Sequence, residues 1–468
     1  MIDTRRQSRR LCNGKETAIK YTWMVLAGLI GLALQSGGAA ATYRVSADGS
    51  DENQGTKDAP WATLQRGVDA AQPGDTILIG PGVYAGCVIR RSGSPEAPIV
   101  LKAEGPGVHI DRLGPENRRR SVIEVGTHGK VIEHWVVDGF EVSGAPRWGI
   151  NLGRTQHVTV QNCRVHDCGL TGIFTSFSDH ITIQFNESYD NHEHGIYHSN
   201  SGDYPIIRGN RSHHNDGCGI HINGDRNMGG DGLISHALVE RNIIWENGRA
   251  GGSAINCDGV SDSVIRNNLC YNNHASGISL YAIDGAEGSS RNQVYHNTVV
   301  MGPDGRWALN IPWWRRRSAP VGNRVANNIF YSSNPQTGAI IIWGEKALGG
   351  CDHNIVAGRF AADAVIAEDA EIDHLSLDQG AALRPAEGGN EVIDLKEWQQ
   401  LGWDVHSREA LPDDLFVNVA EHDYRLSKNS PAIGAGKALP DVTDDLLGRS
   451  RGEAPADVGC YAAGEGPS

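Results

Sequence analysis

The stretch HGIYHSNSGDYPIIRGNRSHHNDGCGIHINGD, residues 194–225, contains nearly the same short unit twice, first as HGIYHSN and then as CGIHING. In each copy a glycine and an isoleucine open a run in which polar and apolar residues alternate, which is the period of a β-strand. The two glycines, Gly195 and Gly219, lie 24 residues apart. A unit that recurs at this interval indicates a solenoid, in which each coil buries its apolar side against its neighbours.

The same register continues over most of the chain. An asparagine follows a short apolar, alternating run at Asn186, Asn210, Asn242, Asn268, Asn297, Asn328 and Asn354. The third residue before each asparagine and the second after it are small or apolar in every copy. Asparagine tolerates the left-handed conformation of a sharp bend, and its amide can bond the asparagine of the next coil. The sequence therefore predicts an all-β fold, a parallel β-helix with a ladder of stacked asparagines.

These features resemble the right-handed parallel β-helix proteins, the superfamily of pectate lyases and chondroitinase B. The segment YRVSADGSDENQGTKDAPWATLQRGVDAAQPGDTILIGPGVY, residues 43–84, is similar to the N-terminal segment of secreted members, and DYRLSKNSPAIGAG with DVGCYA is similar to their C-terminal end. The resemblance covers roughly residues 43–462. It implies right-handed coils whose exposed first end is covered by a helix around ATLQRGVDAA, because an open stack must be capped.

Four regions are predicted along the chain. Residues 1–41 combine basic residues, the apolar run WMVLAGLIGLAL and three final alanines, which is typical of a cleaved signal peptide. Residues 42–97 form the N-terminal cap and lead-in segment, 98–358 form about eight to ten coils, and 359–468 form an irregular C-terminal segment that packs on the helix, of which 359–411 fits no coil. We expect a secreted or periplasmic monomer that is not bound to a membrane after signal removal.

Charge and cysteine content limit the partners further. The formal charge of −14 argues against a nucleic-acid partner, which requires a basic face. An acidic chain that binds an acidic polymer needs local basic groups or a bound cation. Export permits disulfides, and eight cysteines lie beyond the signal, but their spacing shows no CxxC pair, so bridges and buried thiols both remain open.

The resemblance places the substrate on the sheet formed by the strands that begin with Gly-Ile. With Ile196 and Ile220 pointing inward, strand alternation predicts two outward columns. The first is Asn151, Phe174, Tyr197, His221, Asn256, Ser279 and Asn310, and the second is Gly153, Ser176, Ser199, Asn223, Asp258, Tyr281 and Pro312. His198 then points inward, as a hydrogen-bonded core residue.

His221 and Tyr197 are the predicted proton-transfer pair, because an imidazole and a phenol on adjacent outward rungs can abstract one proton and deliver another. A base with the ordinary histidine pKa of about 6.5 should lose activity below about pH 6. Asp258 is a third catalytic candidate. The residues predicted to bind substrate are Asn223, Arg226, Asn256, Tyr281, Asn310, Trp313, Trp314 and Arg315, since indoles offer flat faces to sugar rings and guanidiniums pair with carboxylates.

The glycine-rich loop NGDRNMGGDGLIS, residues 223–235, accounts for the longest interval between ladder asparagines. Together with the neighbouring coils it supplies the carboxylates of Asp225, Asp231, Asp258 and Asp284. Oxygen ligands of this kind suit a hard cation, so the sequence suggests a calcium site there. The alternative is that aspartate and glycine occur simply as turn residues.

These residues favour a polysaccharide lyase that cleaves a uronic-acid polymer by β-elimination. The chain departs from the pectate lyase pattern of calcium and a lysine base, because residues 131–345 contain no lysine. A glycoside hydrolase that pairs Asp258 with Asp225 or Asp231 is the main alternative. A C5-epimerase and a non-catalytic polysaccharide-binding surface protein are the others, because fold alone does not fix function.

Overall fold

The computed structural model describes residues 40–126, 129–313, 318–344, 346–362, 392–452 and 455–464. The predicted signal peptide up to residue 39, and Trp314 and Arg315 of the predicted substrate-binding set, lie outside the described residues. Within the described ranges, no helix has the length and apolar character needed to cross a membrane.

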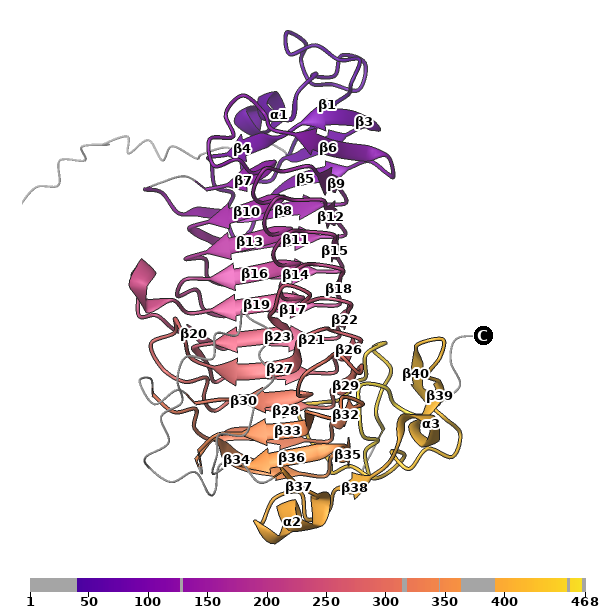
Figure 1. The fold of residues 1–468 in the computed structure, drawn as a ribbon. Helices are drawn as coiled ribbons and strands as arrows, with labels where there is room; N and C mark the ends of the chain where they lie inside the picture. Colours follow the sequence, from indigo (N-terminus) through magenta and orange to yellow (C-terminus); the bar gives the residue numbers. More distant parts are fainter. Residues whose placement is uncertain are drawn as a thin grey trace, which may run out of the picture. The chain divides into compact units, whose positions relative to one another are not determined.

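Three twelve-stranded sheets, here named A, B and C, run side by side along the stack (Figure 1). Sheet A contains β1 (Thr42–Val45), β2 (Thr76–Ile79), β5 (Ile99–Ala103), β8 (Ile132–Asp138), β11 (Thr155–Gln161), β14 (Thr182–Gln184), β17 (Ile206–Arg208), β21 (Leu238–Glu240), β25 (Val264–Arg266), β28 (Gln293–Tyr295), β31 (Asn323–Ala326) and β34 (Leu348–Asp352). Sheet B contains β3 (Gly82–Ala85), β6 (Val108–Arg112), β9 (Glu141–Ser143), β12 (Arg164–His166), β15 (Glu187–Tyr189), β18 (Arg211–His213), β22 (Ile243–Trp245), β26 (Leu269–Tyr271), β29 (Thr298–Met301), β32 (Ile329–Ser332), β35 (Ile355–Ala357) and β38 (Arg408–Glu409).

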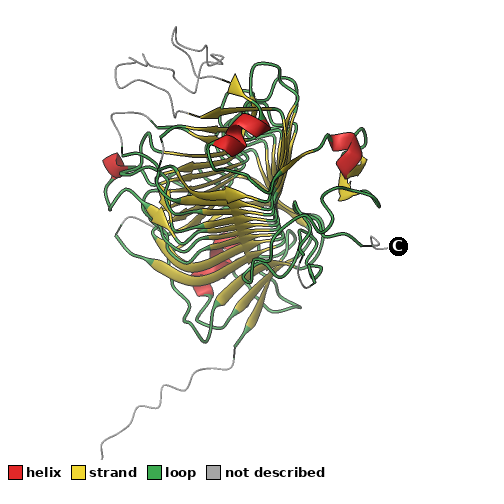
Figure 2. Ribbon diagram, turned by 90° about the horizontal axis from the view of Figure 1, so that it is seen from below, coloured by secondary structure: helices red, strands yellow, loops and turns green. Residues whose placement is uncertain are grey.

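Sheet C carries the Gly-Ile strands. It contains β4 (Cys87–Ile89), β7 (Ile123–Val125), β10 (Ile150–Gly153), β13 (Ile173–Ser176), β16 (Ile196–Ser199), β19 (Ile220–Asn223), β23 (Ser253–Asp258), β27 (Ser276–Tyr281), β30 (Leu309–Ile311), β33 (Gly338–Ile342), β36 (Arg359–Ala362) and β37 (Val392–Ile393). Successive strands pair in parallel except β36 with β37. Figure 2 views the strands of the sheets stacked behind one another, with loops around them. This architecture confirms the predicted all-β fold, a parallel β-helix.

The predicted asparagine ladder is present. From Asn186 to Asn328 the Nδ2 of each ladder asparagine donates to the Oδ1 of the next, at distances such as 3.1 Å from Asn186 to Asn210 and 3.0 Å from Asn210 to Asn242. Each Oδ1 also accepts the backbone N–H of the preceding coil's asparagine. One detail of the prediction is wrong. The left-handed residue is the one before the asparagine, such as Phe185 with φ 56° or Arg241 with φ 56°, because the asparagine itself must aim its amide along the stack.

A second ladder was missed. Five residues after four of the ladder asparagines stand Asn191, Asn215, Asn247 and Asn273, and their amides are bonded in the same way at 2.8 Å, 2.8 Å and 3.0 Å. A third, shorter pair joins Asn292 to Asn323. The recurring asparagine at this spacing is visible in the sequence and would have revealed the second ladder. All these side chains are buried, so each amide must be paired within the protein.

The first end of the stack is covered by α1 (Leu64–Ala70), as predicted from ATLQRGVDAA. Thr63 is its N-cap, and the threonine hydroxyl accepts from the backbone N–H of Arg66. The sheets themselves begin earlier than residue 98, because β1, β2, β3 and β4 already pair with later strands. The predicted lead-in segment is therefore part of the stack.

The last end of the stack is closed by Asp404, which is fully buried. Its Oδ1 accepts from Asn354 Nδ2 at 2.8 Å and from Ser407 Oγ, and its Oδ2 accepts from Trp398 Nε1 at 2.8 Å. Trp398 belongs to α2 (Leu395–Gln400), and beyond it β38 pairs with β35. The coils thus extend past residue 358, and the part of 359–411 that is described contributes to both sheets B and C.

The remaining short elements lie beside the sheets. They are η1 (Arg226–Met228), the parallel pair β20 (Ile234–Ser235) and β24 (Val260–Ser261), α3 (Pro412–Leu415), and the antiparallel pair β39 (Phe416–Asn418) and β40 (Asp423–Leu426). The eight cysteines beyond the predicted signal are all buried, and they are thiols that form no disulfide with one another. Burial raises the pKa of Cys87 and Cys163 to about 12, which keeps those sulfurs protonated.

Candidate active site on sheet C

The strand register confirms that the residues of the two predicted columns on sheet C follow one another from coil to coil. Tyr197 pairs with His221 and His221 with Asn256 in the first column, and Ser199 pairs with Asn223 and Asn223 with Asp258 in the second. The inward prediction for His198 is also confirmed, since its ring is fully buried. Its Nε2–H donates to the Gly202 carbonyl at 2.7 Å, and its Nδ1 is 2.6 Å from Thr175 Oγ1.

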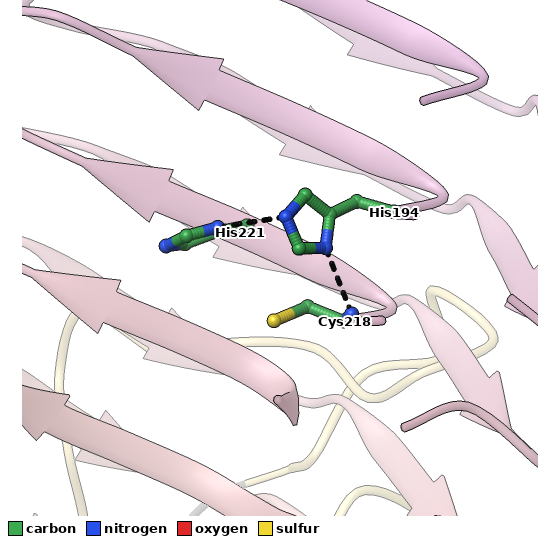
Figure 3. Close-up of side chains that lie close together, drawn as sticks. All are labelled: His194, Cys218 and His221. Carbon is green, nitrogen blue, oxygen red and sulfur yellow. Dashed lines mark hydrogen bonds between the residues drawn. The ribbon is translucent and has the colours of Figure 1, made fainter. Parts of the chain in front are cut away.

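A histidine pair at the start of β16 and β19 fixes the direction of its own hydrogen bonds (Figure 3). The backbone N–H of Cys218 donates to His194 Nδ1 at 2.9 Å. Because a backbone N–H can only donate, Nδ1 of His194 carries no proton, and its neutral ring is protonated at Nε2. That Nε2 lies 3.2 Å from His221 Nδ1, which must accept. His221 is therefore protonated at Nε2, and it offers an N–H donor.

The free end of this chain of hydrogen bonds is unusual. Nε2 of His221 is shielded from solvent and has no hydrogen-bond partner among the described residues, although the side chain as a whole is partly exposed. A shielded N–H without a partner is unfavourable, because it has given up its hydrogen bond to water without replacing it. A substrate oxygen that reaches Nε2 after a small side-chain movement would satisfy it.

The role predicted for His221 as a base does not fit this geometry. Burial lowers the pKa of His194 to about 3, and burial and the neighbouring His194 hold the pKa of His221 well below its usual range. Nδ1 of His221 is occupied by His194, and Nε2 already bears the proton. His221 is thus a neutral donor near neutral pH, and the predicted fall in activity below pH 6 from its titration is not expected.

An aromatic row on the face of sheet C holds the two rings in place. Tyr197 stacks on His221 with ring centroids 4.5 Å apart and an interplanar angle of 6°. On the other side of Tyr197 lies Phe174 at 5.3 Å, and Phe174 stacks on Trp148 at 4.2 Å. Arg147 covers the far face of Trp148 at 3.9 Å from the ring centroid. These ring contacts position Tyr197 and His221 on the sheet.

Tyr197 is suited to donate a proton. Burial raises the pKa of its phenol above the usual value of 10, so the hydroxyl is protonated. Asn223 Nδ2 donates to the phenol oxygen at 3.1 Å, which leaves the phenol's own proton available. The same Asn223 nitrogen lies 3.5 Å from Asp284 Oδ2. The Asn223 amide thus lies next to both the protonated phenol of Tyr197 and the partly exposed carboxylate of Asp284.

Asp258 does not support the catalytic or metal roles predicted for it. Its two oxygens accept the backbone N–H groups of Ile283, Asp284 and Gly285 at 2.9 Å, 3.0 Å and 2.9 Å. Burial raises its pKa to about 6, although these three donors oppose the shift. The side chain is 2% exposed. Asp258 therefore holds the turn that presents Asp284.

The predicted calcium set does not fit a hard cation. Asp225 Oδ1 accepts the N–H of Asn227, and Asp231 Oδ1 accepts the N–H of Leu233, so each carboxylate closes its own turn. Among the described residues, three-ligand clusters occur at His194, Cys218 and His221 and at Asp352, His353 and His406. Neither includes Asp225, Asp231, Asp258 or Asp284.

The cluster at His194, Cys218 and His221 does not suit a metal either. A metal ligand needs a nitrogen lone pair directed at the ion. The lone pair of His194 Nδ1 is directed at the Cys218 N–H, and its Nε2 carries the proton. The cluster therefore relays a hydrogen bond from the Cys218 N–H to His221.

Most of the other residues predicted to bind substrate are paired within the protein. Asn256 Nδ2 donates to Tyr281 Oη at 2.6 Å, and both side chains are buried. Asn310 is 8% exposed, and Trp313 packs beside the apolar cluster of Trp307, Ile341 and Trp343. Arg226 is exposed on η1 and remains a candidate.

Two residues at the site were missed by sequence reasoning. His194 lies just before its strand and carried no alternation signal, although it directly precedes Gly195 as Cys218 directly precedes Gly219 in the next unit. Arg119 lies in the loop between β6 and β7, and its guanidinium covers Gly153, where a Cβ atom would be only 2.3 Å from Arg119 Nη1. No sequence pattern connects Arg119 with that glycine.

Two family descriptions match the chain. Residues 43–204 match "Pel9A-like, right handed beta helix region", and residues 148–310 match "Right handed beta helix region". Together with the three stacked parallel sheets they define the class: the chain is a right-handed parallel β-helix protein. Within that class residues 43–204 are similar to the Pel9A-like proteins, which agrees with the predicted resemblance to pectate lyases.

Individual relatives agree with this assignment. Pectate lyase PEL9 of Emericella nidulans is 26% identical over 311 residues, which cover 56% of this chain and 74% of that protein. The crystal structure of pectate lyase Pel9A superposes with a TM-score of 0.55 at 19% identity, covering 91% of this chain and 96% of that one. A rhamnogalacturonan lyase superposes with a TM-score of 0.52 at 17% identity, covering 78% and 99%. The two structural matches concern the fold alone.

Acid should destabilise the protein through its buried histidines. Burial lowers the pKa of His198 to about 4, below the value of about 6.5 for an unfolded histidine. The contribution of the neutral His198 ring to the free energy of unfolding is fully present above pH 6.5. It is lost as the pH falls toward 4, by about 1.4 kcal/mol per pH unit for each such histidine. The midpoint of thermal unfolding should therefore fall steeply between pH 6.5 and 4.

His198→Gln should make this decline shallower, because the amide can still donate to the Gly202 carbonyl without titrating. His192→Ala, at an exposed histidine, is the control and should leave the pH dependence unchanged. A wild-type midpoint that stays constant from pH 6.5 to 4.5 would contradict the prediction.

Proposed function

We propose that the protein is a secreted polysaccharide lyase that cleaves a uronic-acid-containing polymer by β-elimination. The observation that carries the proposal is the unpaired Nε2–H of His221, fixed by His194 and set beside the protonated phenol of Tyr197. A neutral imidazole whose pKa has been lowered can polarise an oxygen and stabilise charge that develops on it. The pectate lyase relative and the signal-like N-terminus support the substrate class and the export.

The elimination needs three groups. A base removes the proton at C5 of the uronate, the electron pair forms the C4–C5 double bond, and the C4–O bond breaks with protonation of the leaving oxygen. The donor at His221 Nε2 stabilises the charge that develops on the C6 carboxylate. Tyr197 protonates the leaving oxygen, and the Asp284 carboxylate, placed by Asn223 and by the turn bound to Asp258, accepts the C5 proton.

The test is a product assay on acidic polysaccharides with and without esterified carboxyl groups. A lyase gives an unsaturated uronate, which absorbs in the ultraviolet, together with one new reducing end per cleavage. Reducing ends without the unsaturated product would indicate a hydrolase, and neither signal on any uronic-acid polymer would refute the proposal. Asp284→Asn should abolish the product while the unfolding midpoint stays near that of wild type.

Arg119 should contribute to substrate affinity. It is partly exposed over Gly153 on sheet C, and no carboxylate within the described residues forms a salt bridge with it. A guanidinium in this position suits the carboxylate of a sugar several coils away from His221. Arg119→Ala should raise KM about tenfold, which corresponds to about 1.4 kcal/mol, with kcat nearly unchanged.

Arg118→Ala is the matched control, because Arg118 is exposed in the same loop. Its KM should stay within twofold of wild type at moderate salt. Equal effects of the two substitutions would show that only the general charge of the loop matters.

A further inference from the structure

A second group of titratable side chains lies at the far end of the stack, away from sheet C. Asp352 ends β34, His353 follows it in a turn with φ 58°, and His406 comes from the segment between α2 and β38. One ligand atom of each residue lies within 4.8 Å of the other two. The catalytic proposal uses none of these residues.

The carboxylate of Asp352 is shared between the two histidines. Its Oδ1 accepts the backbone N–H groups of His353 and His406, both at 2.9 Å, which fixes the carboxylate plane. Its Oδ2 lies 2.7 Å from His406 Nδ1 and 3.2 Å from His353 Nδ1. The two imidazoles stack at 4.8 Å, so both Nδ1 atoms face the same oxygen from one side.

One of these nitrogens lacks a hydrogen bond. Nδ1 of His353 is shielded from solvent and, although it lies 3.2 Å from Asp352 Oδ2, it has no hydrogen-bond partner among the described residues. Ligand atoms bonded to one tetrahedral zinc ion at about 2.0–2.1 Å lie roughly 3.3 Å apart. The separation of 3.2 Å matches this value. The shorter contact is a hydrogen bond that His406 Nδ1 donates to the carboxylate, so metal binding must release that proton to solvent, and the exposed His406 ring is free to move out to the metal-ligand distance.

We propose that Asp352, His353 and His406 bind a divalent transition-metal ion such as zinc, with water completing the coordination. Two imidazoles and one carboxylate are ligands typical of zinc and unlike those of calcium. The ion joins the end of the last strand of sheet A to the segment that leads into β38. Metal binding at this place therefore secures the C-terminal cover of the stack.

The protonation states agree with this chemistry. Burial opposes ionisation of Asp352, but hydrogen bonds from His406 and His353 lower its pKa overall, so it is a carboxylate near neutral pH. Burial lowers the pKa of His353, so that ring is neutral. Lys437 also lies near His353, and its positive charge opposes the bound cation. Lys437→Gln should therefore tighten binding.

The test is calorimetric titration of zinc into the chelator-treated, full-length protein, together with thermal unfolding. We expect one ion per chain at this site and an upward shift of the unfolding midpoint with zinc but none with calcium. His406→Ala, at a side chain that is 65% exposed, should weaken this binding at least tenfold without destabilising the metal-free protein.

His192→Ala is the matched control, because His192 is also exposed and lies 3.4 Å from a carboxylate, that of Asp216. It should leave zinc binding unchanged. The proposal is overturned if zinc does not bind, or if its binding persists in His406→Ala and disappears in His221→Ala. Neither result depends on whether the protein is a lyase.

Discussion

Replacing His221 with alanine should lower kcat by about 10²–10³-fold, the usual effect of removing one donor that stabilises developing charge. His221→Gln should recover a measurable part of the loss, because a glutamine amide can place an N–H near the position of Nε2 but cannot act as a base. This contrast separates the donor role from the base role. The measurement is the rate of unsaturated product at saturating polymer, at pH 7.

Folding should be nearly unaffected, because His221 points outward and adds little to the core. His213→Ala is the matched control, since His213 is also a partly exposed histidine stacked between aromatic rings, Tyr189 and Trp245, but on sheet B. Full activity of His221→Ala would refute the role of His221. Equal inactivity of the alanine and glutamine variants would argue against the donor role.

His194 should behave as a positioning residue. Because it orients the proton of His221, His194→Ala should lower kcat less than His221→Ala and should raise the pKa of His221 by removing a neighbour that lowers it. The measurement is the pKa of the His221 ring by NMR in the two proteins, together with kcat at pH 7. If neither quantity changes, the hydrogen bond from His194 does not set the protonation of His221.

Asp404→Ala should cause the largest loss of stability, at least about 3 kcal/mol of the free energy of unfolding. The substitution removes the acceptor for four buried donors, on Asn354, Ser407, Trp398 and Cys351. Each buried donor left without a partner costs about 1–3 kcal/mol. The measurement is chemical denaturation monitored by tryptophan fluorescence, with Trp398 as the local reporter.

Asp404→Asn should lose less, because its amide oxygen can still accept from Asn354. Asp413→Ala, at an exposed aspartate of α3, is the control and should change the free energy of unfolding by less than about 0.5 kcal/mol. If Asp404→Ala were as stable as that control, the closure of the ladder would not contribute to folding.

The fold could be predicted because its physical requirements repeat in every coil. A strand buried on one side must alternate, and a buried amide must find a partner one coil away, so Asn210, Asn242 and Asn268 record the architecture directly in the sequence. The faces of sheet C followed from the same alternation, including the inward ring of His198. The ends were harder to define, because Asp404 closes the ladder from a segment with no repeat.

The chemistry of the site could not be predicted in the same way. The tautomer of His221 depends on a backbone N–H of Cys218 that reaches across a coil, and no residue pattern records that contact. Asp258 looked like a ligand or an acid because of its position in the column, yet three backbone donors from the next coil occupy its oxygens. The positions of such backbone donors depend on the conformation of a loop, and the identity of its side chains determines that conformation only weakly.

The asparagine ladder also has a consequence for how the chain can change length. Each of its asparagines donates a hydrogen bond from Nδ2 to the following coil and accepts an identical one at Oδ1 from the preceding coil. Neighbouring coils are therefore chemically interchangeable at this position. A whole coil can be duplicated or deleted there without leaving an amide unpaired, provided that the final asparagine still meets a carboxylate such as that of Asp404. The protein is in this respect modular, with a terminator at one end, and its span along a polymer can be adjusted by single coils.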